Sequence, residues 1–300
     1  MFLPSWWKDH RDSPVFPWRL RSIKENVRLS CEAASHLHPD FAIEGNLPDI
    51  NETSQILLAC GDEIYFYRFA RQLAFTVKQY SPATRIHLHL FEPSTLCVAD
   101  AKMLEARIGK QLSISHETSE RNPFGKPDGI FYAAGRFAIA NFLVRRNNVP
   151  VMTIDIDGRV RRNLARAFDA LKHHDVGVMW RHPEHRPWRT ILACAVFLNN
   201  TERARLFAAR LAEALRLSLM KQPDYHVDQT TLYYLLRYYS FQQLKLDVAN
   251  LDLAWGDHLF GEDSLIWSAK GKRKAEFLAS AKTETGRDLS FTSGLSSSRD

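Results

Sequence analysis

The sequence predicts a single α/β domain built on a largely parallel sheet. From residue 55 onward, short apolar runs alternate with helical patterns of about 10–15 residues, which is the pattern of strands joined by crossover helices. The composition, with 45% hydrophobic and 25% charged residues, is that of an ordinary soluble globular protein. A chain of 300 residues is long enough to bury one sizeable core.

The first half of this domain predicts four strands with helices between them. Strands are expected at the short apolar or alternating runs 55–60, 85–92, 112–116 and 149–154. Helices are expected where apolar residues recur at helical spacing, at 65–79, 100–108 and 131–146. The pairs Gly61-Asp62 and Ser81-Pro82 break the pattern between these elements.

The second half contains the same kinds of element in a looser order. Expected here are a helix at 163–172, strands at 176–180 and 191–198, a helix at 201–219 and another from Asp228 onward. The segment 181–189 is rich in Arg, His and Pro and is expected to be a loop.

Two terminal segments differ in composition from this domain, which we place at 51–282. Residues 1–50 are expected to form an irregular arm, because aromatic residues such as Trp6 and Trp7 alternate there with basic residues and prolines. These aromatics either pack on the domain or make a peripheral contact with a membrane or a partner. The tail at 283–300 is polar and rich in Ser, and it is expected to be flexible.

The net charge and the cysteines indicate where the protein works. Forty basic residues against 34 acidic ones give a net charge of +6, which fits an enzyme of phosphorylated donors, a protein beside anionic lipid or a nucleic-acid binder. The four cysteines are far apart and are expected to be reduced thiols. No signal peptide and no run of about 18 apolar residues is visible. We therefore expect a cytoplasmic protein, peripheral to the inner face of the membrane at most.

An acidic pair follows the most apolar of the expected strands. Asp155 and Asp157 are two residues apart at its carboxyl end, where ligands bind in open α/β sheets. Side chains at i and i+2 of a strand point the same way, so both carboxylates can reach one cation. A divalent cation such as Mg²⁺ or Mn²⁺ would neutralise the pair and could also bridge a diphosphate. The alternative is that the pair caps a turn at the strand end.

Five segments in a fixed order indicate a family. They are ACGDEIY at 59–65, FYAAGRF at 131–137, VMTIDIDGRVRRNL at 151–164, DQTTL at 228–232 and SAKGKRK at 268–274. Together they resemble the retaining glycosyltransferases of the GT-A fold, the family that includes glycogenin and lipopolysaccharide galactosyl- and glucosyltransferases. The resemblance covers roughly residues 55–275 and implies a Rossmann-like mixed sheet flanked by helices in a single domain.

The resemblance also implies roles for individual residues. In the donor site, Asp62 and Tyr65 would contact the base and ribose of the nucleotide, and Arg136 would hold the donor sugar or phosphate. Gly271 and Lys274 would approach the diphosphate.

The remaining roles concern the metal and the reacting sugar. Asp155 and Asp157 would bind the metal, and Asp155 would also contact the nucleotide. At the sugar, Asp228 would hydrogen-bond the transferred hexose, and Gln229 would lie against its anomeric carbon. The alternative for this second pair is a plain helix N-cap made by Asp228.

The sequence departs from the family pattern at two places. Ser268 stands where the family has a metal-binding histidine, and a hydroxyl is a poorer ligand for Mn²⁺. Several alternatives follow: two carboxylates and the diphosphate hold the metal, or the metal is bound weakly. Otherwise Lys270, Lys272 and Lys274 replace much of its charge, or Asp263 or His258 substitutes. The second departure is Ala193-Cys194-Ala195, which lacks the glycine expected on the acceptor side.

The function that the sequence predicts is glycosyl transfer. A hexose would move from a nucleotide-diphosphate sugar, UDP-linked by expectation, to a glycan or lipid-linked saccharide, with Mn²⁺ or Mg²⁺ as cofactor. Retention is implied by the resemblance alone, and the alternative is an inverting reaction in which Asp228 or another acid serves as the base. One alternative is a degenerate GT-A-like protein that binds sugar nucleotides without catalysis. Another is a sugar-phosphate nucleotidyltransferase, although the Gly-rich, basic loop that such an enzyme needs after its first strand is not found at 59–63. Carboxylates at the strand end argue against a nucleic-acid partner.

Overall fold

The structure, a computed structural model, describes residues 17–33, 42–49, 51, 54–117, 129–221, 226–269, 273–274 and 277. Within these residues the main sheet has eight strands in the order β1-β4-β3-β2-β5-β8-β7-β9. Their bounds are Glu44–Gly45 (β1), Ile56–Gly61 (β2), Arg85–Phe91 (β3), Leu112–Glu117 (β4), Val151–Asp155 (β5), Val176–Trp180 (β7), Ile191–Leu198 (β8) and Val248–Asn250 (β9). The four strands predicted for the first half are therefore all present.

The sheet is mixed, with a parallel centre. Strands β4, β3, β2 and β5 run parallel to one another, whereas β1 is antiparallel to β4 and β8 is antiparallel to both β5 and β7. The antiparallel direction of β8 relative to β7 follows from the short connection between these two strands. That connection holds only the four-residue helix α7 (Pro187–Thr190). A parallel pair needs a crossover of a dozen or more residues, so this connection suits an antiparallel pair. The segment predicted as a loop at 181–189 thus includes the start of this short helix.

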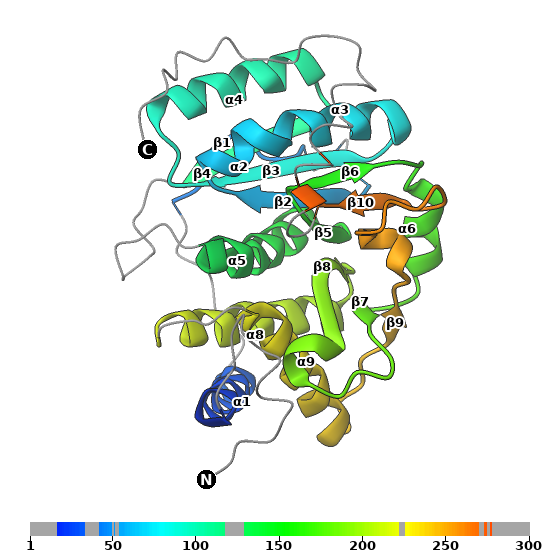
Figure 1. Ribbon diagram of the computed structural model, residues 1–300. Coiled ribbons are helices and arrows are strands. Elements are labelled where there is room, and N and C mark those ends of the chain that lie inside the picture. The colour runs from blue at the N-terminus through cyan, green and yellow to red at the C-terminus, as the bar shows by residue number, and fades with distance from the viewer. Residues whose placement is uncertain are drawn as a thin grey trace.

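Helices cover both faces of the sheet (Figure 1). They are α2 (Glu63–Tyr65), the π-helical turn η2 (Phe66–Ala70), α3 (Arg71–Tyr80), α4 (Thr95–Ile108), α5 (Gly129–Asn147), α6 (Ala165–Leu171), α8 (Glu202–Leu219), α9 (Val227–Phe241) and the 3-10 helix η3 (Leu253–Gly256). In Figure 1, α3 and α4 lie on one side of β2 and β3, and α5 lies on the other. The helix predicted at 65–79 is therefore real, but a π-helical turn interrupts its start.

The core has two layers, one on each face of β2. All six residues of this strand are buried. Ile56 and Leu58 pack into the cluster that includes α5, α8 and α9, and Leu57 and Ala59 pack into the cluster that includes α3 and α4. This alternation is why the strand reads as a continuous apolar run in the sequence. The three-layer arrangement leaves the carboxyl ends of the parallel strands as an edge where side chains can gather.

The prediction of an irregular arm at 1–50 is wrong for part of that segment. Pro17–Glu32 form helix α1, which packs on α8 and α9 and buries Ile23 and Val27. Proline is tolerated in the first turn of a helix, and apolar residues four apart lie on one helix face, so the local sequence is compatible with this helix. Asn26 anchors it by donating from Nδ2 to Ser218 Oγ at 3.1 Å.

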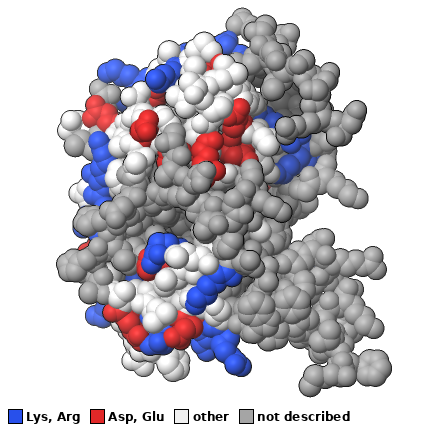
Figure 2. All heavy atoms as spheres, turned by 90° about the vertical axis from the view of Figure 1, so that its left-hand side faces the viewer, with Lys and Arg blue, Asp and Glu red and all other residues white. Residues whose placement is uncertain are grey.

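The other predictions for the chain ends lie outside the described residues. Trp6 and Trp7 are not described, and neither is the tail at 283–300. The membrane or partner contact of the arm therefore stays a prediction. No helix in the described part of the chain is long and apolar enough to span a bilayer. All four cysteines are free thiols, as predicted. Figure 2 shows acidic and basic side chains interspersed on the described part of one face.

Candidate active site

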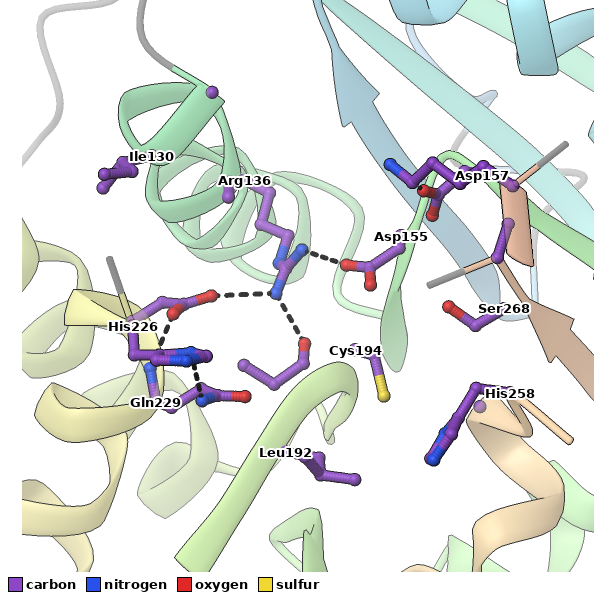
Figure 3. A pocket seen from close by; sticks show the side chains of 17 residues that line it. Ile130, Arg136, Asp155, Asp157, Leu192, Cys194, His226, Gln229, His258 and Ser268 are labelled. Atoms are coloured by element: carbon purple, nitrogen blue, oxygen red, sulfur yellow. Dashed lines mark hydrogen bonds and ion pairs between the residues drawn. The ribbon is translucent and has the colours of Figure 1, made fainter. Parts of the chain in front are cut away.

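A cavity of about 230 Å³ lies at the carboxyl end of β5 (Figure 3). Its walls come from segments far apart in the sequence. They are Gly129, Ile130, Ala133, Arg136, Asp155, Asp157, Leu192, Ala193, Cys194, His226, Asp228, Gln229, Gly256, His258, Ser268, Ala269 and Lys274. Seven of the residues singled out in the sequence for metal, donor or catalytic roles are in this set. The acidic pair thus opens into a cavity and does not merely cap a turn.

A small second sheet brings the C-terminal motif to the acidic pair. Strand β6 (Gly158–Val160) begins directly after Asp157 and pairs antiparallel with β10 (Ile266–Ser268). In this register Ser268 lies opposite Gly158, and the amide of Ala269 donates to the carbonyl of Asp157 at 3.0 Å. The backbone pairing therefore places Ser268 and Ala269 beside the acidic pair.

Arg136 links three elements at the wall of the cavity. Its Nη1 donates to Asp155 Oδ1 at 2.5 Å, and its Nη2 donates to the carbonyl of Ala193 at 2.6 Å and to Asp228 Oδ2 at 3.2 Å. The residue is only 5% exposed. Burial alone would lower the pKa of Arg136, but the carboxylates of Asp155 and Asp228 outweigh it and hold this pKa above its ordinary value. Figure 3 shows the guanidinium of Arg136 turned toward the carboxylate of Asp155.

Asp157 is the more buried carboxylate of the acidic pair. Its side chain is 7% exposed, against 34% for Asp155. Burial and the neighbouring charge of Asp155 raise the pKa of Asp157 to about 6, although the ammonium of Lys274 acts in the other direction. Lys274 Nζ lies 2.8 Å from Asp157 Oδ2 and also donates to the hydroxyl of Tyr65 at 2.7 Å. The cavity thus holds a carboxylate whose charge a cation would stabilise.

Asp228 and Gln229 begin helix α9 on the opposite wall. Both oxygens of Asp228 accept hydrogen bonds, Oδ1 from the amide of Gln229 at 2.8 Å and Oδ2 from Arg136. Gln229 is 8% exposed and donates from Nε2 to the carbonyl of Trp188 at 2.8 Å. The N-cap residue of α9 is His226, so the alternative of a plain N-cap by Asp228 is wrong.

Two of the expected donor-site residues do not line this cavity. Asp62 caps α2 by accepting from the amide of Tyr65 at 2.8 Å. Tyr65 reaches the site only indirectly, because its hydroxyl and ring contact Lys274. Gly271 lies outside the described residues. The first strand-to-helix loop therefore stands at the margin of the cavity.

The structure also adds residues to the site. His226 and Leu192 line the cavity, and nothing in the sequence motifs pointed to either. His258, named from the sequence as one substitute for the missing histidine ligand, lines it as well. Asp263, the other substitute, does not, because its side chain is 99% exposed and pairs with Arg162. The segment expected on the acceptor side contributes Ala193 and Cys194.

The protein side chains at this site could hold a divalent cation only if oxygen atoms of a bound substrate or of water complete its coordination. Asp155 and Asp157 supply hard oxygen atoms, and burial together with the charge of Asp155 raises the pKa of Asp157. Within the described residues, however, no group of three or more His, Cys, Asp or Glu side chains could hold a metal ion. Ser268 adds only a hydroxyl. Diphosphate and water oxygens would have to complete the coordination, as they often do for Mg²⁺.

The chain has the GT-A fold, as the sequence resemblance predicted, because its architecture matches solved structures of that fold. Among solved structures, the chain is similar to the bifunctional glycosyltransferase WbbM, with a TM-score of 0.52 and 12% identity over 82% of this chain and 50% of that one. It therefore spans half the length of WbbM. An active-site mutant of LgtC aligns with a TM-score of 0.51 and 15% identity, over 75% of this chain and 95% of that one. No protein-family profile matches the chain, and neither does the sequence of any curated protein.

Proposed function

We propose that this chain is a glycosyltransferase that moves a hexose from a nucleotide-diphosphate sugar, by preference a UDP-sugar, to a saccharide or lipid-linked saccharide. The observation that carries the proposal is the position of Arg136. One buried guanidinium joins Asp155, from the metal-site motif, to Asp228, from the sugar-site motif, at the wall of a single cavity. The fold shared with solved glycosyltransferases supports the same reading.

The basic residues of the cavity are proposed to hold the donor. A diphosphate needs cations and hydrogen-bond donors, and Lys274, whose side chain is 30% exposed, offers an ammonium. Tyr65 keeps this ammonium in place from its other side at 2.7 Å. Asp62 and Tyr65 are proposed to meet the base and ribose at the cavity margin, and Gly271 to allow the backbone close to the diphosphate.

A divalent cation, Mn²⁺ or Mg²⁺, is proposed to bind Asp155 and Asp157 together with the donor. When bound, it would supply positive charge for the leaving nucleoside diphosphate. Ser268 lines the same wall, and its hydroxyl is a weaker ligand than the imidazole that the family has there. When the cation binds, it would replace Lys274 as the partner of Asp157. The ammonium of Lys274 would then be available to the diphosphate.

The proposed stereochemical course is retention. An inverting transfer needs a carboxylate poised as a base toward the acceptor hydroxyl. Both oxygens of Asp228 are already engaged by Arg136 and by the amide of Gln229. A carboxylate held in this way is suited to orient the sugar and is poorly suited to take a proton from the acceptor.

Titration calorimetry with UDP-, GDP- and CDP-sugars, each with and without Mn²⁺, tests this proposal. We expect one nucleotide to bind more tightly with the metal and Asp157→Ala to abolish this metal effect. Asp169→Asn, an exposed acid in α6, is the matched control and should bind as the wild type does. Binding that is unaffected by Asp157→Ala would sink the metal site, and no nucleotide binding would sink the function.

One observation favours a second candidate, a sugar-nucleotide-binding protein without catalysis. Asp155 and Asp157 each already have a cation partner in Arg136 and Lys274. A site neutralised in this way could bind a nucleotide without a metal. Release of UDP from a bound UDP-sugar separates the two candidates, because a binding protein would leave the donor intact.

A further inference from the structure

The carboxamide of Gln229 is held by two acceptors at the wall of the cavity. Its Nε2 lies 2.8 Å from the carbonyl oxygen of Trp188 and 2.7 Å from Nδ1 of His226. Within the part of the chain that the structure describes, its oxygen accepts no side-chain or backbone hydrogen bond. Figure 3 shows this oxygen pointing away from His226.

The carbonyl of Trp188 fixes the orientation of the Gln229 carboxamide, that is, which of its two end atoms is the nitrogen and which is the oxygen. A carbonyl oxygen can only accept, so the atom 2.8 Å from it must be the NH₂ group of Gln229. The second N–H of that group then points to His226, whose Nδ1 must accept. It follows that His226 is a neutral imidazole with its proton on Nε2. A protonated imidazole would place its Nδ1–H against an N–H of Gln229, and because two donors repel, the carboxamide would favour the flipped orientation.

The backbone holds His226 in a fixed place for this contact. Its φ of 70° is in the left-handed region, which few residues other than glycine adopt, although histidine is among the more tolerant. Its carbonyl accepts from the amide of Thr230 at 3.0 Å and from the hydroxyl of Thr230 at 2.9 Å. A residue kept in such a conformation by its surroundings is typical of a functional site.

We propose that His226 is a positioning residue that keeps the carboxamide oxygen of Gln229 turned toward the sugar in the cavity. This inference rests on the proposed glycosyl transfer. The transferred sugar develops positive charge like an oxocarbenium ion in the transition state. A carbonyl oxygen that faces this charge stabilises it, whereas the NH₂ group of a flipped carboxamide would oppose it. The side chain thus acts on the reaction through Gln229 and need not touch the substrate.

Two variants of His226 test the proposal. His226→Gly removes the acceptor and keeps the left-handed backbone without strain. His226→Asn restores an acceptor oxygen close to the place of Nδ1 and also tolerates this backbone. The measurements are kcat and KM for release of UDP from UDP-glucose or UDP-galactose with Mn²⁺, together with UDP affinity by calorimetry.

We expect His226→Gly to lower kcat by at least about tenfold, which is about 1.4 kcal/mol of transition-state stabilisation. Its UDP affinity should stay within about threefold of the wild type, and His226→Asn should regain most of the kcat. Three results overturn the proposal: an unchanged kcat in His226→Gly, an equal loss of UDP affinity, or a His226→Asn variant as slow as His226→Gly. A wild type that binds UDP-sugars and never releases UDP would overturn the proposed catalysis instead.

A measurement without turnover completes the test. The ¹⁵N chemical shifts of the imidazole distinguish its tautomers, and the wild-type protein labelled at histidine should show His226 with an unprotonated Nδ1. Assignment by comparison with His226→Asn identifies the signal. A protonated Nδ1 at neutral pH would overturn the positioning role even if the protein transfers sugars.

Discussion

Arg136 Nη1 in α5 lies 2.5 Å from Asp155 Oδ1 at the end of β5. The same guanidinium reaches Asp228 at 3.2 Å, so one cation pairs with two carboxylates that belong to different sequence motifs. This pairing joins a helix of one layer to the edge of the sheet and offsets part of the negative charge of the cavity.

Removing that cation should destabilise the fold. Arg136→Met removes the guanidinium that pairs with Asp155 and Asp228, and the loss of one member of a buried pair costs about 3–5 kcal/mol. Because Asp155 is 34% exposed, we expect the lower end of this range, measured by urea unfolding. Adding Asp228→Asn to Arg136→Met should recover part of the loss. A single variant as stable as the wild type would mean that solvent already balances both carboxylates.

Restoring an imidazole should strengthen the metal site. Ser268→His places a nitrogen ligand on the wall that already carries Asp155 and Asp157, and we expect Mn²⁺ to bind about tenfold more tightly in calorimetric titration. Ser268→Asn, which is similar in position but offers no imidazole, is the matched control. Equal Mn²⁺ affinity in all three proteins would show that the wall of β10 does not face the metal.

Lys274 should matter for the diphosphate more than for folding. Lys274→Met removes the ammonium that pairs with Asp157 at 2.8 Å and should weaken UDP binding by about tenfold, since a charged hydrogen bond to a phosphate is lost. Lys102→Met, at an exposed position of α4, serves as the control and should bind UDP normally. If the two variants bind UDP equally well, Lys274 is only a counterion for Asp157.

Acid should weaken a contact that lies outside the cavity. Asp175 is 1% exposed and accepts from the amide of Asp247, from Thr201 and from Arg203. Burial opposes ionisation, but these hydrogen bonds outweigh it and lower the pKa of Asp175 below 3.8.

The lowered pKa of Asp175 determines how the stability of the protein changes with pH. A lowered pKa in the folded state means that the stabilisation is present above pH 3.8 and is lost as the pH falls below it. Asp175→Asn should therefore be less stable than the wild type at pH 7, by about 1–3 kcal/mol, with a smaller difference at pH 3. Urea unfolding at both pH values measures this, with Asp169→Asn as the control. A difference that does not change with pH would contradict the lowered pKa.

Much of the fold could be predicted because apolar runs mark buried strands directly. The strand that ends at Asp155 was located to within a residue or two, and with it the acidic pair, since a run buried on both faces contains few polar residues. The elements that escaped prediction are short or atypical. Strands β6 and β10 have three residues each, too few for a period to be visible, and α1 follows a proline-rich stretch that resembled an irregular arm.

The structure brings most of the residues that the motifs indicated to one cavity, together with residues that no motif indicated. Asp228 and Gln229 were identified as a pair, but the histidine three residues earlier has no distinguishing neighbour in the sequence. Its role depends on the carbonyl of Trp188, which belongs to another segment. No local pattern encodes such a contact.

The sequence by itself determined the alternation of strands and helices, the place of the acidic pair at a strand end and the order of the motifs. These properties depend on residues close to one another along the chain, where burial and charge leave a local pattern. Only the tertiary structure decided that Arg136 pairs with two carboxylates, that Ser268 and Lys274 lie beside Asp157, and that His226 contacts the carboxamide of Gln229. Those contacts join residues from separate elements, and their distances follow from how the layers pack.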